Sequence, residues 1–230
     1  MREFKKTKLR LGTSLTASER AALTVSLLHH VLTVLENSKV FATVIVASDI
    51  RSTSGLANKF RKVLVIREKR YHGGVNKAMG DGIGHVRSQF INATSLMLIP
   101  SDLPLLSREA INEAISKLNE NDLVITPSIR RDGTSLLLFN LPRGKIPLHY
   151  DDNSYRQHLK EAKKLKIRYS IFPRKEFSFD VDMLSDLRKL MTNLKTKTIR
   201  ELSQKLESGP SPCRISTLFL SVIPGSEYAS

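Results

Sequence analysis

The alternation of short apolar runs with helix-like patterns constrains the fold of this chain more than any other feature of its sequence. Apolar residues at helical spacing predict a helix over about 17–36, and similar patterns cover about 75–90 and 107–119. Short apolar runs predict buried strands at 41–47, 63–66, 95–100 and 123–126. Such alternation is typical of a mostly parallel sheet with helices on both faces, so we expect a three-layer α/β fold.

The second half of the chain predicts a different connection. Thr134–Phe139 follows a tight turn, which favours a strand that runs antiparallel to its neighbour. Further strands are expected at 167–172 and 177–181. We assign residues 1–206 to a single domain. Residues 207–230 contain Gly-Pro-Ser-Pro, and we expect this C-terminal tail to fray.

The chain is strongly basic. Its 230 residues hold 37 Lys and Arg against 22 Asp and Glu, a formal net charge of +15. Such a field favours polyanionic partners, namely nucleic acid, an anionic membrane or phosphorylated small molecules. The basic residues are spread along the chain and no nucleic-acid motif is present, so nucleic acid is the weaker expectation.

Other features of the composition narrow the class of protein. Cys213 is the single cysteine, which excludes a disulfide within the chain and a Cys-rich zinc site. No apolar run approaches the ~18 residues of a spanning helix. The basic N-terminus lacks the apolar core of a signal peptide. We therefore expect a cytoplasmic protein without a membrane span.

Three acidic residues follow predicted strands. Asp102 comes directly after the apolar run that ends at Pro100, and ligands of open α/β sheets bind outside such strand ends. Asp180 and Asp182 are two residues apart, which in a strand places both on one face. Carboxylates in this arrangement suit Mg²⁺ or Mn²⁺ beside a substrate phosphate. The alternatives are that Asp102 caps a turn and that Asp182 is the N-cap of the next helix.

Two polar segments could hold an anion. Gly133-Thr134-Ser135 and Asn153-Ser154 place hydroxyl and backbone N–H groups at the starts of predicted elements. A plain N-cap role for Ser154 is the alternative. Gly73-Gly74, before the helix over 75–90, would permit close approach of an anion or a base.

These segments, in their order and spacing, resemble the 2-phospholactate guanylyltransferases (CofC) of coenzyme F-420 biosynthesis, whose fold is similar to that of the molybdenum-cofactor guanylyltransferases. The resemblance covers residues 8 to about 206. It rests on Lys8-Leu9-Arg10-Leu11, Thr16-Ala17-Ser18-Glu19-Arg20, Gly74-Val75-Asn76, Pro100-Ser101-Asp102-Leu103-Pro104-Leu105-Leu106, Asp132-Gly133-Thr134, Tyr150-Asp151-Asp152-Asn153-Ser154-Tyr155 with His158-Leu159, and Phe179-Asp180-Val181-Asp182.

The resemblance implies a three-layer, Rossmann-like nucleotidyltransferase fold of the GT-A/MobA-like type, and it implies roles for these residues. Lys8 and Arg10 would contact the phosphates of the substrate GTP and act in catalysis with Asp102. Gly74 and Asn76 would lie at the guanine. Residues at the phosphorylated acid would be Thr134, Asp151 and Ser154, and the ligands of Mg²⁺ or Mn²⁺ would be Asp102, Asp180 and Asp182.

The chain departs from the family pattern in two places. The family has a buried central strand before the segment that Lys8 opens, beside the strand that carries Asp102. That first strand is missing here, and we expect the true start to lie upstream. Asp151 stands where the family pattern has Gly, and its carboxylate would repel an acceptor phosphate unless it is turned away or bound to a metal.

The expected activity is transfer of GMP from GTP to a three-carbon phosphorylated acid, with release of diphosphate. The acceptor stays open among 2-phospholactate, phosphoenolpyruvate and 3-phosphoglycerate. The alternatives are another nucleotidyltransferase of this fold with a different phosphate acceptor, or a basic nucleic-acid-binding protein without catalysis. Partners would be small-molecule substrates, a homodimer is left open, and no membrane partner is expected.

Overall fold

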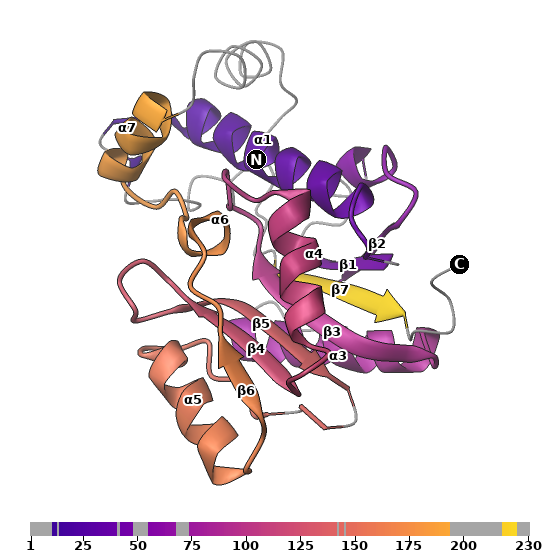
Figure 1. The fold of residues 1–230 in the computed structure, drawn as a ribbon. Coiled ribbons are helices and arrows are strands. Elements are labelled where there is room, and N and C mark those ends of the chain that lie inside the picture. The colour runs from indigo at the N-terminus through magenta and orange to yellow at the C-terminus, as the bar shows by residue number, and fades with distance from the viewer. Residues whose placement is uncertain are drawn as a thin grey trace.

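A seven-stranded sheet covered by helices on both faces forms the protein (Figure 1). The computed structural model describes residues 11–12, 14–40, 42–47, 55–67, 74–141, 143–144, 146–193 and 218–224. The strands are β1 (Ala42–Ala47), β2 (Val63–Arg67), β3 (Ala93–Pro100), β4 (Leu123–Pro127), β5 (Thr134–Asn140), β6 (Tyr169–Ile171) and β7 (Leu218–Pro224). The helices are α1 (Ala17–Glu36), α3 (Gly74–Gln89), α4 (Arg108–Lys117), α5 (Ser154–Lys164), α6 (Lys175–Ser178) and α7 (Leu184–Asn193).

The strands lie in the order β2-β1-β7-β3-β5-β4-β6. Strands β1 and β2 pair in parallel, as do β4 and β6. Strand β7 is antiparallel to β1 and β3, and β5 is antiparallel to β3 and β4. Among the described strands, all except β5 and β7 therefore point in one direction. The predicted α/β sheet and the antiparallel strand at 134–139 are confirmed, but the sheet is mixed, because of these described strands only β1–β2 and β4–β6 are parallel neighbours.

The two faces of the sheet carry separate hydrophobic layers. Leu96 and Leu98 of β3 pack in a cluster that includes residues of α3 and α5. Met97 and Ile99 pack in a second cluster with residues of α1, α4 and α6. All four β3 side chains are fully buried, which is why β3 shows a continuous apolar run rather than alternation. The predicted three-layer arrangement is confirmed.

The helix predicted over 17–36 has those bounds. The Glu19 N–H donates to Thr16 Oγ1 at 3.2 Å, and the Thr16 N–H donates to Glu19 Oε2 at 2.6 Å. This reciprocal pair forms the capping box that the sequence indicates. None of the helices within the described ranges is long and apolar enough to cross a membrane.

The predicted C-terminal tail, residues 207–230, contains a central strand of the sheet. The prediction that residues 207–230 fray is wrong for Leu218–Pro224, because β7 pairs with β1 on one side and with β3 on the other. Leu96 is opposite Val222, and Val44 is opposite Leu220. Strand β7 therefore occupies the place beside β3 where the resemblance puts a first strand, and it runs antiparallel to β3. Backbone groups of β1 and β3 gain partners by this pairing, which no local pattern encodes.

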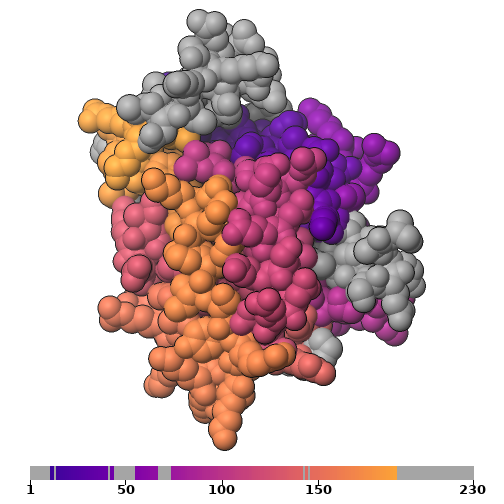
Figure 2. Space-filling model, viewed as in Figure 1, coloured from indigo at the N-terminus to yellow at the C-terminus, as the bar shows by residue number. Residues whose placement is uncertain are grey.

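The strand predicted at 177–181 is also wrong. The N–H groups of Ser178 and Phe179 donate back to the carbonyls of Arg174 and Lys175, which closes the short helix α6. Figure 2 shows the chain from β6 through α6 to α7 running beside α4. An ion pair of 3.2 Å between Arg174 and Glu113 joins the two segments.

Candidate active site

One edge of the sheet holds two of the predicted site residues, Asp102 and Thr134. Leu98 of β3 pairs with Leu137 of β5. Ser101 lies three residues after Leu98, and Thr134 lies three residues before Leu137. The carboxyl end of β3 therefore meets the start of β5. Strand β4 ends at the same edge, where Pro127 is opposite Thr134. Asp102 and Thr134 therefore belong to adjacent strand ends, as expected of a ligand crevice in an open α/β sheet.

The loop that carries Asp102 is anchored in the core. Leu103 and Leu106 are buried, and the Leu106 N–H donates to the Leu103 carbonyl at 3.2 Å. The Leu106 carbonyl in turn accepts a hydrogen bond from His30 Nε2 at 3.1 Å. Burial lowers the pKa of His30, which favours the neutral ring that donates from Nε2. Helix α1 therefore holds the loop, and Asp102 remains half-buried at its start.

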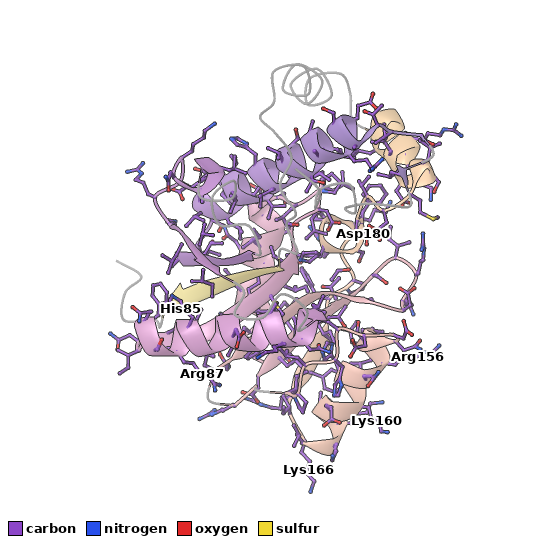
Figure 3. All side chains as sticks on the ribbon, turned by 180° about the vertical axis from the view of Figure 1, so that it is seen from behind. His85, Arg87, Arg156, Lys160, Lys166 and Asp180 are labelled. Carbon is purple, nitrogen blue, oxygen red and sulfur yellow. The ribbon has the colours of Figure 1, made fainter. Side chains whose placement is uncertain are left out.

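The segment of Asp180 and Asp182 lies at the end of the molecule where α1 and α7 are found (Figure 3). Phe179 and Val181 are buried, whereas Asp180 and Asp182 are half-buried. This alternation agrees with the predicted placement of both carboxylates on one side of the chain, although the segment is not a strand. Leu105, from the loop of Asp102, packs against the cluster that contains Phe179 and Val181. The segment of Asp102 and the segment of Asp180 and Asp182 therefore pack in the same hydrophobic cluster.

The N-cap alternative for Asp182 is wrong. The start of α7 is capped by Asp186, whose Oδ2 accepts the N–H groups of Asp182 at 3.3 Å and Met183 at 2.9 Å. Helix α7 begins at Leu184, so its N-cap position is Met183 and Asp182 lies one residue earlier.

The acidic residues do not form a complete metal site by themselves. The part of the chain that the structure describes contains no group of three or more His, Cys, Asp or Glu side chains that could hold a metal ion. Asp102, Asp180 and Asp182 are all within that part, so the three-carboxylate clamp expected from the sequence is not assembled. Mg²⁺ usually takes only one or two protein carboxylates and completes its shell with water and phosphate oxygens. Asp102 with Asp180 or Asp182 fits a site of one or two protein carboxylates.

Asn76 connects the segment predicted to bind guanine with the segment predicted to bind the phosphorylated acid. Its Oδ1 accepts the Tyr150 N–H at 2.7 Å, and its Nδ2 donates to Asp151 Oδ2 at 2.7 Å. The first turn of α3 is thereby tied to the loop before α5. The Asp151 carboxylate, the departure from the family pattern, is held by this amide. Gly74 begins α3 with a φ of 70°, a conformation that favours glycine.

Thr134 and Ser154 are in direct contact. The Thr134 N–H donates to Ser154 Oγ at 2.8 Å, and Ser154 Oγ lies 3.4 Å from Thr134 Oγ1. Both residues are buried. Ser154 is the first residue of α5, and the N-cap is Asn153, so the plain N-cap alternative for Ser154 is wrong. The two hydroxyl groups that the resemblance assigns to the acid lie side by side.

His158 belongs to a motif of the resemblance, but the sequence assigned it no role. Its ring is fully buried, Nδ1 lies 2.9 Å from Thr134 Oγ1, and Nε2 accepts the His149 N–H at 2.9 Å. Burial and the nearby His149 lower the pKa of His158 to about 4, so the ring is neutral at neutral pH. The available signal was its position four residues after Ser154, on the same face of α5.

Lys8 and Arg10 lie outside the described residues, and their predicted contacts with the GTP phosphates remain predictions.

Solved structures share the fold of this chain. The crystal structure of a protein assigned as a nucleotide-diphospho-sugar transferase from Desulfovibrio desulfuricans G20 superposes with a TM-score of 0.69 at 18% identity, covering 90% of this chain and 93% of that one. A cytidylyltransferase from Leptospira borgpetersenii superposes with a TM-score of 0.50 at 15% identity, covering 79% and 83%.

The fold, the polar sheet edge and the similarity of sequence together define an enzyme of the nucleotidyltransferase class. The family model described as Guanylyl transferase CofC like matches residues 1–223. The chain belongs to this family, which confirms the resemblance seen in the motifs.

Relatives with assigned activities support this placement. The 2-phospho-L-lactate guanylyltransferase of Methanocaldococcus jannaschii is 32% identical over 181 residues, 78% of this chain and 75% of that protein. The same enzyme of Methanocaldococcus vulcanius is 30% identical over 180 residues, with shares of 78% and 76%. The phosphoenolpyruvate guanylyltransferase of Rubrobacter xylanophilus is 27% identical over 191 residues, with shares of 83% and 90%.

Proposed function

We propose that this protein transfers GMP from GTP to 2-phospho-L-lactate or phosphoenolpyruvate in coenzyme F-420 biosynthesis, with release of diphosphate. The activities of its relatives support the reaction class and both acceptors. The observation that carries the proposal for this chain is the buried contact of Thr134 with Ser154 at the sheet edge where Asp102 follows β3. A buried pair of hydroxyl groups offers hydrogen-bond donors that suit the anionic groups of a phosphorylated acid.

Thr134, Ser154 and the start of α5 would bind the acid. The Asn153 side chain makes no capping hydrogen bond to any residue that the structure describes, and Asn153 has a φ of 58°. The first N–H groups of α5 are thus not taken by an N-cap side chain. Helix N-termini attract anions through such groups and through the helix dipole. The acid would receive these N–H groups together with the hydroxyl donors.

Asn76 would act on the substrates through the loop it holds. Its amide already bonds Tyr150 and Asp151, so its main effect would be to fix the entrance of α5 against the first turn of α3. In this role Gly74 and the start of α3 would approach the guanine nucleotide. The hydrogen bond from Asn76 also offsets part of the Asp151 charge that would otherwise oppose the acid.

Asp102, with Asp180 or Asp182, would hold Mg²⁺ or Mn²⁺ together with phosphate oxygens of the substrate. When bound, such an ion neutralises charge on the triphosphate and on the departing diphosphate. Lys8 and Arg10 would add positive charge at the same phosphates. The net charge of +15 would favour the encounter with two polyanionic substrates.

The chemistry needs positioning more than proton transfer. A phosphate monoester has a second pKa of ~6, so the acid is mostly dianionic at neutral pH and needs no general base. One of its phosphate oxygens forms a bond to the α-phosphorus of GTP, the bond from the α-phosphorus to the β-phosphate oxygen breaks, and diphosphate leaves. In-line alignment by the hydroxyl pair and the start of α5 would supply the main acceleration.

Diphosphate release tests the proposal. Purified protein is incubated with Mg²⁺ and GTP, alone and with each of 2-phospho-L-lactate, phosphoenolpyruvate and 3-phosphoglycerate, and ATP and CTP replace GTP in parallel. We expect acid-dependent release with GTP, and a loss of kcat of about 100-fold or more in Asp102→Asn. Glu120→Gln, exposed after the end of α4 at the opposite edge, is the control. Acid-independent release, or full activity of Asp102→Asn, would contradict the proposal.

A further inference from the structure

A chain of hydrogen bonds fixes which nitrogen of His158 carries its proton. The His149 N–H can only donate, so His158 Nε2, 2.9 Å away, must accept and carries no hydrogen. A neutral imidazole then holds its proton on Nδ1. Nδ1 lies 2.9 Å from Thr134 Oγ1, so the ring donates to this hydroxyl oxygen.

Because the ring donates to Thr134 Oγ1, the Thr134 hydroxyl accepts from His158 and does not donate to it. Thr134 Oγ1 accepts from His158 and, at 3.4 Å, from Ser154 Oγ. The Thr134 N–H is used by Ser154. Within this described network, no acceptor takes the hydroxyl hydrogen of Thr134. Because its oxygen accepts from the ring, the Thr134 hydroxyl cannot donate to His158, and its hydrogen can be directed to an anion.

The ring that imposes this arrangement is rigidly held. His158 has no exposed surface, and Tyr150 meets its ring edge to face, with centroids 5.2 Å apart and planes at 69°. His149 packs on the ring at a centroid distance of 5.9 Å. Rotation of the imidazole would break both of its hydrogen bonds and leave buried groups unpaired.

We propose that His158 is a positioning residue for the phosphorylated acid, because it holds the Thr134 hydroxyl as a hydrogen-bond donor to the anionic group of that substrate. The inference rests on the proposed function for the identity of the acid. It adds a residue that acts through Thr134 and does not itself contact the reacting atoms.

Two amide variants separate the two bonds of the ring. In His158→Asn the amide lies near the place of Nδ1 and can still donate to Thr134. In His158→Gln the amide reaches the place of Nε2 and can only preserve the bond from His149. We expect His158→Gln to raise the KM for the acid by about tenfold, with the KM for GTP unchanged, since a hydrogen bond to a charged group is weakened. His158→Asn should stay within about threefold of wild type.

A double-mutant cycle tests whether His158 acts through Thr134. In a Thr134→Val background the hydroxyl is absent, so His158→Gln should add less than a twofold further change in the KM for the acid. His29→Gln, on α1 at the far end of the molecule from α5, is the matched control (Figure 1). Equal effects of His158→Gln in both backgrounds, or a parallel rise in the KM for GTP, would overturn the proposal.

Two further measurements do not depend on turnover. ¹⁵N NMR of the imidazole should show the tautomer protonated at Nδ1 for His158, and the tautomer protonated at Nε2 would refute the inference. Calorimetric binding of 2-phospho-L-lactate and of inorganic phosphate should be about tenfold weaker in His158→Gln, and unchanged binding would also refute it. Absence of GMP transfer by the wild-type protein with every acid would instead refute the proposed function.

Discussion

Replacement of Asn76 by Ala should weaken the contact between the first turn of α3 and the loop before α5. The change removes the acceptor of the part-buried Tyr150 N–H and the donor to the Asp151 carboxylate, each at 2.7 Å. The N–H left unpaired costs about 1 kcal/mol, the low end for a group that water can partly reach, and the exposed bond to Asp151 adds about as much. A loss of about 2 kcal/mol lowers Tm by about 4–8 °C for a chain of this size.

The same change should also weaken the binding of the acid. Tyr150 and Asp151 belong to the loop that leads into α5, so this loop should lose its fixed position when the amide is removed. We expect the KM for the acid to rise by about fivefold or more, and the KM for GTP to rise less, since loose positioning of a bound group is costly. The assays are thermal unfolding and steady-state diphosphate release at varied acid and varied GTP.

A pair of charge variants provides the control. Asn76→Asp keeps an acceptor for the Tyr150 N–H but places a carboxylate against Asp151, and like charges at this distance repel. Adding Asp151→Asn to Asn76→Asp restores one donor and one acceptor across this contact, so the double variant should be more stable than Asn76→Asp alone. An Asn76→Ala protein with wild-type Tm and wild-type KM for the acid, or a double variant without recovery, would refute this reasoning.

Two further predictions concern the support of the sheet at the opposite edge. A Cβ on Gly144 would lie 2.0 Å from the Asp122 carbonyl oxygen, so Gly144→Ala should destabilise the protein by about 3 kcal/mol. Gly84→Ala, on open helix surface, should stabilise it by about 0.5–1 kcal/mol. Both are measured by denaturant unfolding, and equal midpoints would contradict the steric argument. Arg168 Nε donates to Asp122 Oδ2 at 3.0 Å, and this bond lowers the pKa of Asp122. The stabilisation it brings is present above the ordinary carboxyl pKa of about 4 and is lost as pH falls through the lower folded value. The Tm difference between wild type and Arg168→Met should therefore shrink below pH 4, whereas a constant difference would exclude this linkage.

Local sequence patterns predicted much of the fold. The capping box at Thr16 and Glu19, with the apolar spacing behind it, was sufficient for the bounds of α1. The apolar runs that became β1, β2, β3 and β4 are short, continuous and bounded by polar residues or Pro, which is the pattern of buried strands. Asp102, Thr134 and Ser154 were predicted as site residues because strand ends and helix starts are where α/β sheets bind ligands.

Other features could not be found in local patterns. Residues 175–182 hold Phe-Ser-Phe-Asp-Val-Asp, an alternation typical of a strand, yet backbone hydrogen bonds to Arg174 and Lys175 form α6. The bonds from Asn76 to Tyr150 and Asp151 join residues about 75 positions apart. His158 was part of a motif of the resemblance, but its contact with Thr134 was visible only in the structure.

By itself, the sequence determined most of the elements, the polar groups at their ends and the family, because each depends on residues that are close along the chain or in a fixed order. The tertiary structure decided the place and direction of β7 between β1 and β3, and the partners of Asn76 and His158. The physical reason is that the hydrogen-bonding groups of strands and of buried side chains are paired across distant segments. A strand's own residues specify that it needs partners, but only the folded chain specifies which ones.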